Sequence, residues 1–331
     1  MPAEQEPATE EAPGRADGPR PAPDEVSRTR AWIMAMRPQV KPAGASPVIV
    51  GTAMALHDGV FALWPALAAL FGALLIQTGT DLANDYYDFA KGVDTDESSG
   101  YVRVSQSGLI PARRVLAAAL GCFGVSFLIG IYLVAIGGVP IVVVGLASIA
   151  SGLAYSGGPY PIGYHGLGDL FTFVFFGLVA VSGTYYVQAA SLIPGQVPIW
   201  IPPGTLPLEV IVASLPMAGL VTNILVVNNI RDIEDDARAG KRTLAVILGY
   251  RGSRAEYVLL VALAYAVPVW FLLKPDFGVA VLLPFLSLPL AGVTAWMVLT
   301  GTETEELNPA LERTGQLVFA FATLFAVGIL R

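Results

Sequence analysis

The sequence has few cysteines, histidines and charged residues, and each shortage excludes a class of protein. Cys122 is the only cysteine in the 331 residues, so the chain has neither a disulfide framework nor a paired-cysteine metal site. The two histidines, His57 and His165, lie in loops expected on opposite faces, which argues against a histidine-based metal centre. Charged residues make up 14% of the chain, against roughly 25% in soluble domains, so an ordinary soluble domain is excluded.

Long apolar runs are what the sequence has in place of charge. Hydrophobic residues make up 54% of it, and a run of roughly 20 such residues crosses about 30 Å of hydrocarbon. Turn residues separate nine such runs, and the division at Gly137–Gly138 is a glycine pair inside one apolar stretch. The predicted spans are 39–57, 61–83, 115–136, 138–156, 167–192, 207–229, 255–273, 278–299 and 314–330. We therefore predict an all-α, polytopic membrane protein whose nine transmembrane helices surround a central cavity.

The distribution of lysine and arginine predicts the orientation of these spans. With the N-terminus in the cytoplasm, every Lys and Arg except Lys274 and Arg331 falls in the tail or near the cytoplasmic ends of the spans. The two long polar loops, about 84–114 and 230–254, then share the cytoplasmic face of the cell (plasma) membrane. A lipid bilayer is the expected environment, and no nucleic-acid partner is expected.

The N-terminal segment differs in composition from the rest. Residues 1–25 hold seven of the 26 acids, are rich in Pro, Glu, Ala and Gly, and have no apolar run able to form a core. They also lack the apolar region of a signal peptide. We predict a disordered tail over 1–30 and a nine-helix membrane domain over 31–331.

Two polar segments follow apolar spans and begin with the same pattern. The second predicted span runs into NDYYDFAKGVDTDESSG (84–100), and the sixth runs into NNIRDIEDDARAGKRTLAVILG (228–249). Each segment begins with Asn-x-x-x-Asp, at Asn84–Asp88 and at Asn228–Asp232. Because each closes the second helix of a four-helix half, the match suggests an internal duplication.

The spacing of these acids has a geometric meaning, because residues four positions apart share one face of a helix. The stripes predicted in this way are Asp81–Asp85, Asn84–Asp88 and Asn228–Asp232–Asp236. Like charges on one face repel unless a cation lies between them, and hard divalent cations prefer carboxylate oxygens together with substrate phosphates. Two such clusters facing each other across a cavity would hold Mg²⁺, or Mn²⁺, bridged to a diphosphate.

A bound diphosphate also requires positive charge nearby. The two long polar loops supply candidates in Lys91, Arg103, Arg231, Lys241 and Arg242. Arginine suits bidentate contacts with phosphate, and lysine supplies a point charge. The alternative interpretation is a solvated acidic loop at the membrane edge. We favour that alternative for the remaining acids of the two segments, which are Asp96, Glu97, Glu234 and Asp235.

Four stretches resemble, in the same order, the UbiA superfamily of intramembrane aromatic prenyltransferases. Within it the chain looks like the menaquinone branch, the 1,4-dihydroxy-2-naphthoate polyprenyltransferases. The stretches are MRPQVKPAGASPVIVGTAMA, NDYYDFAKGVDTDESSGYVRVSQSGLI, YSGGPYPIGYHGLGDLFTFVFFGLVAVSGTYYVQ and NNIRDIEDDARAGKRTLAVILG. The resemblance covers about residues 35–331 and implies a role in menaquinone biosynthesis.

The resemblance also assigns roles to acids of the two motifs. Asn84, Asp85 and Asp88 match the first motif of the superfamily, and Asp232 and Asp236 match the second. The broad pattern places another acid at position 92, where this chain has glycine. Asp94 follows instead, in a spacing that looks like the menaquinone branch. By resemblance these groups bind Mg²⁺ and the diphosphate of a polyprenyl donor.

Two further site residues are implied outside the acidic motifs. Arg37 matches a basic position that faces the site in relatives. Tyr155 matches the first member of a Tyr-x-x-x-Lys pair found in some relatives, but Pro159 stands where the lysine would be. A basic residue of the loops, Lys91, Arg103 or Lys241, would take its place. We thus assign substrate binding to Arg37, Asn84, Lys91, Asp94, Arg103, Tyr155, Asn228, Arg231 and Lys241.

The implied reaction alkylates an aromatic ring and removes its carboxylate. Positive charge helps the diphosphate to leave, and an allylic cation develops on the prenyl chain. Aromatic faces would stabilise that cation; candidates are Tyr86, Tyr87, Tyr155 and Tyr160, although residues of an interfacial aromatic belt look the same in sequence. 1,4-Dihydroxy-2-naphthoate is the implied acceptor.

Three other functions compete with this one. The nearest is the same scaffold acting on 4-hydroxybenzoate, homogentisate or an ether-lipid precursor. A CDP-alcohol phosphotransferase also uses acids and Mg²⁺, but the sequence lacks the glycine and the downstream acids of that family's pattern. A secondary transporter would fit internal repeats and intramembrane acids, yet these acids lie at helix ends rather than at mid-membrane.

Overall fold

The computed structural model describes residues 26–92, 103–193 and 197–331. Within these ranges the chain is helical and forms no strand. The helices are α1 (Arg28–Met36), η1 (Pro38–Val40), α2 (Pro42–His57), α3 (Leu63–Ala90), α4 (Ala112–Ala154), η2 (Ile162–His165), α5 (Gly168–Thr172), η3 (Phe173–Val179), α6 (Ala180–Ser191), α7 (Leu208–Arg231), α8 (Ile233–Arg238), α9 (Leu244–Leu272), η4 (Val279–Ser287), α10 (Leu288–Thr300) and α11 (Thr304–Ile329).

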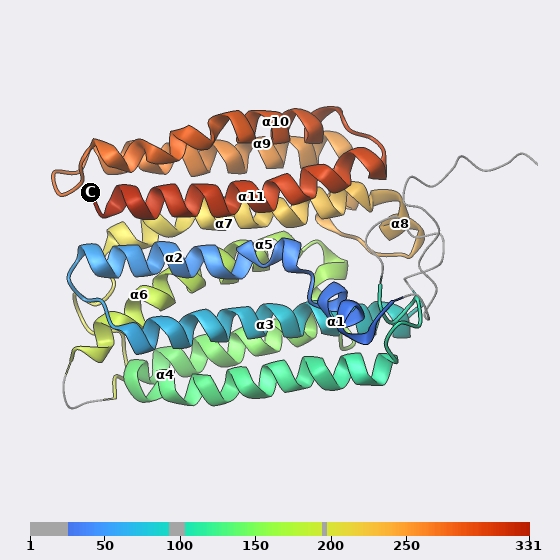
Figure 1. Ribbon diagram of the computed structural model, residues 1–331, viewed down its shortest axis with the longest axis horizontal. Helices are drawn as coiled ribbons and strands as arrows, with labels where there is room; N and C mark the ends of the chain where they lie inside the picture. The colour runs from blue at the N-terminus through green and yellow to red at the C-terminus, as the bar shows by residue number, and fades with distance from the viewer. Residues whose placement is uncertain (1–25, 93–102, 194–196) are drawn as a thin grey trace, which may run out of the picture.

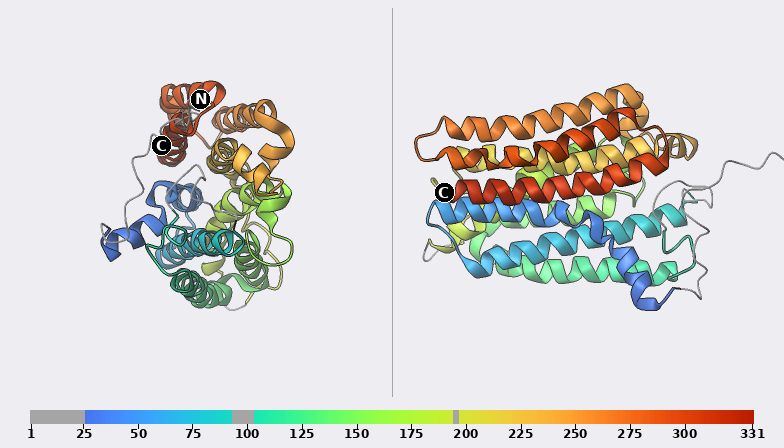
Figure 2. Two further views of the ribbon diagram at one scale, coloured as in Figure 1. Left: turned by 90° about the vertical axis from the view of Figure 1, so that its right-hand side faces the viewer. Right: turned by 45° about the horizontal axis from the view of Figure 1, so that its top comes forward.

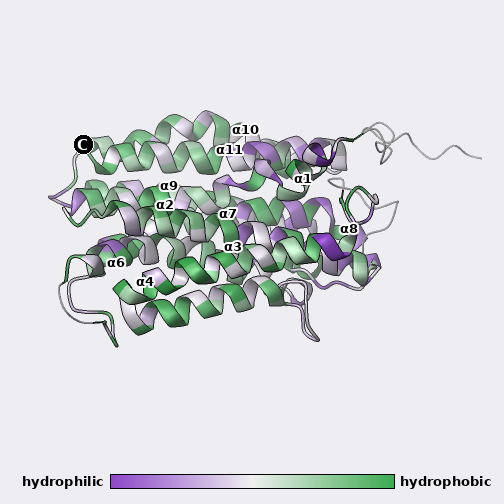
Figure 3. Cartoon of the chain, turned by 60° about the horizontal axis from the view of Figure 1, so that its bottom comes forward, coloured by the Kyte–Doolittle hydropathy of each residue, from purple (hydrophilic) through white to green (hydrophobic). Residues whose placement is uncertain are grey.

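The long helices lie side by side in one elongated bundle (Figure 1). Seen nearly along their axes, the helices are grouped as a bundle and do not form separate flat layers (Figure 2). Hydrophilic residues gather at the ends of the bundle, most densely at the end that carries α1 and α8 (Figure 3). The C-terminus lies at the opposite end. This arrangement places the C-terminal ends of α3 and α7, with Asp88 and Asp232, at one end of an apolar bundle.

The described helices agree with the nine predicted membrane spans. Seven helical stretches are long and apolar enough to cross a membrane, and α4, with 43 residues, is among them. At about 1.5 Å per residue, α4 is about twice as long as the hydrocarbon core is thick. It bends back at Gly138 and counts as two spans. With the shorter α2, the described residues hold nine, and the chain is a multi-pass membrane protein. Outward-facing side chains such as Leu128, Val143 and Leu259 are exposed, as lipid contact requires.

The predicted boundary at Gly137–Gly138 is confirmed, and its cause is visible. Gly138 has φ 64° and ψ −150°, a conformation that disfavours any residue with a Cβ. A Cβ there would also collide with the carbonyl of Pro198, whose oxygen accepts a hydrogen bond from Val139 N at 2.8 Å. The glycine therefore lets the loop before α7 reach into the bend of α4.

The main apolar core joins α2, α7, α9 and α11. Tyr257, Phe271, Phe321 and Phe325 are fully buried in it, and Phe271 meets Phe325 edge to face at 5.5 Å between ring centroids. Such aromatic pairs contribute about 0.5–1.5 kcal/mol beyond their buried area. α7 is the most buried candidate span, with 78% of its apolar window inside the protein. A rigid wall thus presents the second acidic motif at the end of α7.

The span from α5 to α6 departs from α-helical geometry in its middle. η3 is a π-helix over Phe173–Val179, a form that often widens a helix at a functional site. Gly177 lies so close to α7 that a Cβ would be 2.2 Å from the Cα of Ala218. The close approach of these helices leaves the larger η3 side chains Phe175 and Phe176 to line an internal cavity.

The N-terminal boundary lies earlier than the sequence suggested. α1 begins at Arg28, capped by Ser27, whose Oγ accepts a hydrogen bond from Arg30 N at 3.3 Å. Residues 28–30, which we assigned to the tail, are therefore helical. Ala31 and Ala35 of this short helix pack against α3 in a second apolar cluster. The predicted disorder of residues 1–25 lies outside the described residues.

Candidate active site

A cavity of about 800 Å³ runs inside the bundle and carries charged side chains at one end. α2, α3, α4, α6, η3 and α7 contribute to its wall. Its apolar part is lined by side chains such as Ile76, Ile141, Phe176 and Val187. The polar end is lined by Arg37, Asp81, Asn84, Asp88, Arg103, Gln106, Tyr155, Tyr164, Asn228, Arg231, Asp232, Asp236 and Lys241. The cavity thus joins charged groups to a long hydrocarbon-like space.

The first acidic motif faces this cavity through Asn84 and Asp88. Asp88 is fully buried, and its Oδ1 accepts a hydrogen bond from the hydroxyl of Tyr164 at 2.6 Å. Arg103 donates to Asn84 Oδ1 at 2.9 Å and lies 3.7 Å from Asp88 Oδ2. Asn84 in turn donates to the hydroxyl of Ser156 at 2.5 Å. α3, the loop after it and the loop after α4 therefore meet around one carboxylate.

Asp85, the second residue of this motif, has different contacts. It is only 4% exposed, and it is absent from the residues that line the cavity. Its Oδ2 accepts a hydrogen bond from Val104 N and its Oδ1 accepts one from Ser105 N, both at 3.1 Å. The structure therefore separates Asp85 from the other acids with which the motif groups it.

The second motif lies across the cavity at the end of α7. Arg231 clamps Asp232 through two hydrogen bonds, each 2.7 Å long, and also donates to Asn228 Oδ1 at 2.9 Å. A third branch of the guanidinium reaches Asn308 of α11 at 3.0 Å. α7 ends at Arg231, so the predicted continuous stripe through Asp236 breaks at Asp232, and Asp236 belongs to α8.

Lys241 joins the two motifs. Its Nζ lies 3.3 Å from Asp88 Oδ2 and 3.3 Å from Asp236 Oδ1, so the two carboxylate oxygens are no more than twice that distance apart. The ammonium also lies over the ring of Tyr164, 4.9 Å from its centroid. Burial raises the pKa of Asp236 to about 6, and Lys241 counteracts this effect. A cation already occupies the place where the acids of α3 and α8 meet.

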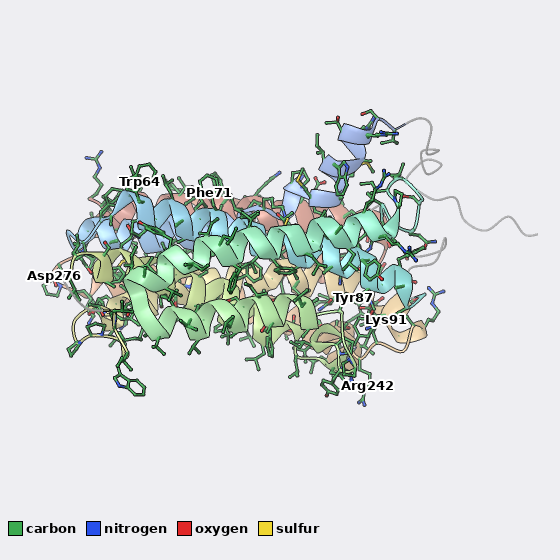
Figure 4. All side chains as sticks on the ribbon, turned by 90° about the horizontal axis from the view of Figure 1, so that it is seen from below. Trp64, Phe71, Tyr87, Lys91, Arg242 and Asp276 are labelled. Carbon is green, nitrogen blue, oxygen red and sulfur yellow. The ribbon has the colours of Figure 1, made fainter. Side chains whose placement is uncertain are left out.

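Three further predicted residues surround this centre. Lys91 does not line the cavity. It donates a hydrogen bond to the carbonyl of Ser156 at 2.6 Å and lies over the ring of Tyr164. Burial lowers the pKa of Lys91. Arg37 lines the cavity from a left-handed backbone conformation with φ 48°, which is costly for a residue with a side chain. Tyr155 lines it from the end of α4. Figure 4 shows Lys91 and Arg242 at the same end of the bundle, opposite Asp276.

Asp94 lies outside the described residues, as do Asp96 and Glu97. Of the aromatic candidates, Tyr160 is exposed and stacks on His165 instead of lining the cavity. Tyr164, which was not among the predicted residues, makes the contacts that were expected of the predicted tyrosines: its hydroxyl reaches Asp88 and its ring lies against two ammonium groups. The stretch YSGGPYPIGYHG contains Tyr155, Tyr160 and Tyr164. Their spacing alone did not indicate that Tyr164, in η2, faces the cavity.

The polar end also holds Gln106, which sequence reasoning missed and which lines the cavity. Asp81, from the predicted stripe Asp81–Asp85, lines it too and pairs with Lys41 at 3.0 Å. Among the described residues, no three side chains of the metal-ligating types converge closely enough to hold an ion by themselves. The site thus offers hard oxygen donors on two walls and cations between them, an arrangement suited to binding an anion together with a divalent cation.

Comparisons with known sequences agree with this picture. The model of the UbiA prenyltransferase family matches residues 45–325. A 1,4-dihydroxy-2-naphthoate octaprenyltransferase of Mycobacterium tuberculosis is 37% identical over 300 residues, which cover 89% of this chain and 96% of that protein. A protein of the same name from Escherichia coli is 34% identical over 311 residues, which cover 92% and 96%.

Solved structures share the fold at low sequence identity. A UbiA homologue from Aeropyrum pernix in its apo form has a TM-score of 0.59 at 15% identity, over 87% of this chain and 96% of that one. A UbiA homologue from Archaeoglobus fulgidus bound to DMAPP and Mg²⁺ has a TM-score of 0.56 at 16% identity, over 90% and 99%. At these identities the likeness concerns the fold.

Proposed function

The chain belongs to the UbiA prenyltransferase family, and from this premise we propose that it joins a polyprenyl chain to 1,4-dihydroxy-2-naphthoate. The donor is a polyprenyl diphosphate, the ring carboxylate leaves as CO₂, and the product enters menaquinone biosynthesis. One observation carries the proposal: a single cavity has paired acids and cations at one end and an apolar wall along the rest. A diphosphate with a long hydrocarbon tail has the same two-part chemistry.

The polar end supplies groups for the diphosphate and for a divalent cation. Arg103 and Lys241 are the cations nearest to Asp88, and we assign them to the phosphate oxygens. Asn84, Asp88, Asn228, Asp232 and Asp236 are the oxygen donors that would hold Mg²⁺ or Mn²⁺. Because no three carboxylates converge among the described residues, the diphosphate itself and water would complete the coordination. When bound, such a cation neutralises the charge that builds up on the leaving group.

The reaction balances without an added base. The bond between C1 of the prenyl chain and the diphosphate oxygen breaks, and the diphosphate keeps the electron pair. The ring carbon that bears the carboxylate forms a bond to C1. The bond from that carbon to the carboxylate then breaks, CO₂ departs and its electrons restore the aromatic ring. The protein has to orient the ring and stabilise the separating charges.

Neighbouring side chains fit these two tasks. The face of Tyr164 already lies against two ammonium groups, 4.7 Å from Lys91 and 4.9 Å from Lys241, so this ring is placed to stabilise positive charge. Tyr155 lines the same region from the end of α4, and Arg37, which lies between α1 and η1, is assigned to the acceptor. The apolar wall excludes water, which would otherwise quench the cation.

The orientation follows from the same placement. We assign the end that carries α1, α8 and the acidic motifs to the cytoplasm, because lysine and arginine gather there. The plasma membrane is then the proposed location, and both substrates reach the site from the cytoplasmic side. The orientation can be tested with single cysteines, introduced at either end of the bundle after Cys122 is replaced. In intact cells, a membrane-impermeant thiol reagent should label only the cysteines at the end opposite the acidic motifs.

The test of the activity is an assay in membranes with carboxyl-labelled 1,4-dihydroxy-2-naphthoate and polyprenyl diphosphates of several lengths. We expect one labelled CO₂ for each prenyl group joined. In a competition at equal concentration, 4-hydroxybenzoate should be the poorer acceptor, because each missing apolar contact costs roughly 1–3 kcal/mol. Preference for the single-ring acid, or label retained on the product, would assign the chain to another acceptor within the family.

The metal assignment has its own test. Prenyl transfer should stop when excess EDTA is added and return with Mg²⁺ or Mn²⁺, since only a divalent cation reconciles the motif carboxylates with a diphosphate. Full transfer in excess EDTA would reject the assigned role of the cation.

A further inference from the structure

Asp85 belongs to the acidic motif by sequence but contacts a different part of the protein. Asn84 and Asp88 line the cavity, whereas Asp85 does not. Each of its carboxylate oxygens accepts one backbone N–H, from Val104 and from Ser105. A carboxylate that accepts backbone N–H groups in a buried place is a strong, charge-assisted anchor. Both carboxylate oxygens of Asp85 are thus bonded to a loop, and the side chain does not line the cavity where a metal ion would bind.

The anchored loop carries two residues of the polar end. Arg103 and Gln106 both line the cavity, and they flank the two amides that Asp85 holds. The loop is closed on itself, because Ser107 N donates to Arg103 O at 3.0 Å and Ile110 N donates to Val104 O at 3.2 Å. A shift at Val104 or Ser105 would therefore move Arg103 as well.

Other contacts also join the loop to α3. The side chain of Val104 is fully buried in the apolar cluster with Leu82 and Ala83. Arg103 itself reaches Asn84 and Asp88. Apolar packing is not directional, so it holds Val104 against α3 without determining the orientation of the loop. The two hydrogen bonds to Asp85 are directional and determine that orientation.

We propose that Asp85 is a positioning residue that docks the loop 103–107 on α3 and so holds Arg103 and Gln106 over the diphosphate end of the cavity. It is not a ligand of the divalent cation. The role in docking stands on the contacts alone, and the role in donor binding rests on the proposed function. Asp88, one turn further along α3, is the acid of this motif that faces the substrate.

The first experiment measures docking directly. Hydrogen exchange of the Val104 and Ser105 amides is followed in the full-length protein in detergent, for wild type, Asp85→Asn and Asp88→Asn. The amide group of asparagine can accept only one of the two hydrogen bonds, so exchange in Asp85→Asn should be at least about tenfold faster, the scale of one hydrogen bond to a charged group. Asp85→Glu, which keeps both acceptors, should recover part of the protection. Unchanged exchange in Asp85→Asn would overturn the proposal.

The second experiment separates docking from metal binding. Calorimetry measures Mn²⁺ affinity at saturating inorganic diphosphate. Asp85→Asn should stay within about twofold of wild type, whereas Asp88→Asn should lose at least about tenfold, as removal of a coordinating group predicts. A loss in Asp85→Asn equal to that in Asp88→Asn would show that Asp85 is a ligand after all and reject the proposal.

The third experiment asks whether Asp85 acts through its loop. Asp85→Asn and Arg103→Ala should each raise KM for the prenyl donor, and the double variant should fall well short of the product of the two effects, because residues that share one contact are not additive. Full additivity would contradict the proposal. If the wild-type protein transferred no prenyl group at all, the proposed function would fail, and the amide exchange and Mn²⁺ measurements would still decide the role of Asp85.

Discussion

Replacing Lys241 with methionine tests the centre of the site, because this one ammonium holds the two acidic motifs together. It lies 3.3 Å from both Asp88 and Asp236, and the side chain of Asp88 is only 1% exposed. At an effective dielectric constant of about 20, unit charges at that distance attract by about 5 kcal/mol. Desolvation offsets part of this, and loss of one partner from a buried pair typically costs about 3–5 kcal/mol.

The same free energy opposes any divalent cation that enters without a diphosphate, since it has to displace the ammonium. Lys241→Met removes this competitor and leaves two carboxylates facing each other. We therefore expect the affinity for Mg²⁺ alone to rise by about 10²-fold or more, because about 1.4 kcal/mol corresponds to tenfold. Prenyl transfer should fall by about 10²-fold, since a phosphate contact is lost. The two quantities thus change in opposite senses.

Calorimetric titration of Mg²⁺ without diphosphate checks the affinity, at about pH 8 so that Asp236, whose pKa is raised to about 6, is ionised. Lys274→Met is the matched control, because Lys274 also pairs with a carboxylate, Glu209 at 3.1 Å. It belongs to the loop between α9 and η4, and Asp276 of that loop lies at the end opposite Lys91 and Arg242 (Figure 4). Lys274→Met should change neither quantity. An affinity for Mg²⁺ in Lys241→Met that is equal to or weaker than in wild type would refute the reasoning.

Three more outcomes are expected. Asp88→Ala and Asp232→Ala should each slow prenyl transfer by at least about 10²-fold, the scale of one strong electrostatic group. Asp96→Ala should change the rate little. Equal small effects on the measured rates at all three positions would mean that these acids are only solvated residues at the membrane edge. The affinity for Mg²⁺ should weaken as the pH falls through about 6, because the pKa of Asp236 is raised by burial and a proton then competes for its carboxylate. Each further pH unit should lower the affinity by about tenfold. A calorimetric series in which the affinity stays constant down to about pH 5 would contradict this. A protein that begins near Val26 should insert and retain its activity, because residues 1–25 have no composition able to fold; normal insertion with no transfer in the membrane assay would show that the tail is needed.

The number and order of the membrane helices could be predicted from the sequence, because burial in hydrocarbon depends on local composition and length. Gly137–Gly138 illustrates this: a glycine pair inside an apolar run indicated a break, and Gly138 provides it. The boundary at residue 30 was placed too late, because α1 is short, partly exposed and held by packing on α3 that no local pattern reveals.

The candidate site was predictable only where helix periodicity determines which side chains share a face. The spacing Asn84–Asp88 indicated that both face one way, and the structure places both on the cavity. The same spacing treated Asp85 as their equal, although its carboxylate is held by amides that come from a loop about 20 residues further along. Tyr164 and Lys241 reach Asp88 from elements 76 and 153 residues away in the chain.

The sequence by itself thus determined the membrane spans, the family and the types of residue at the site, since each of these is written in local composition, spacing or a contiguous motif. Only the tertiary structure decided which acids meet, which cation lies between them and which motif residue turns away. The physical reason is that a side chain's hydrogen-bond partner is chosen by packing between distant helices and loops. The free energy of a buried charge depends on that partner, and neighbours in the chain do not specify it.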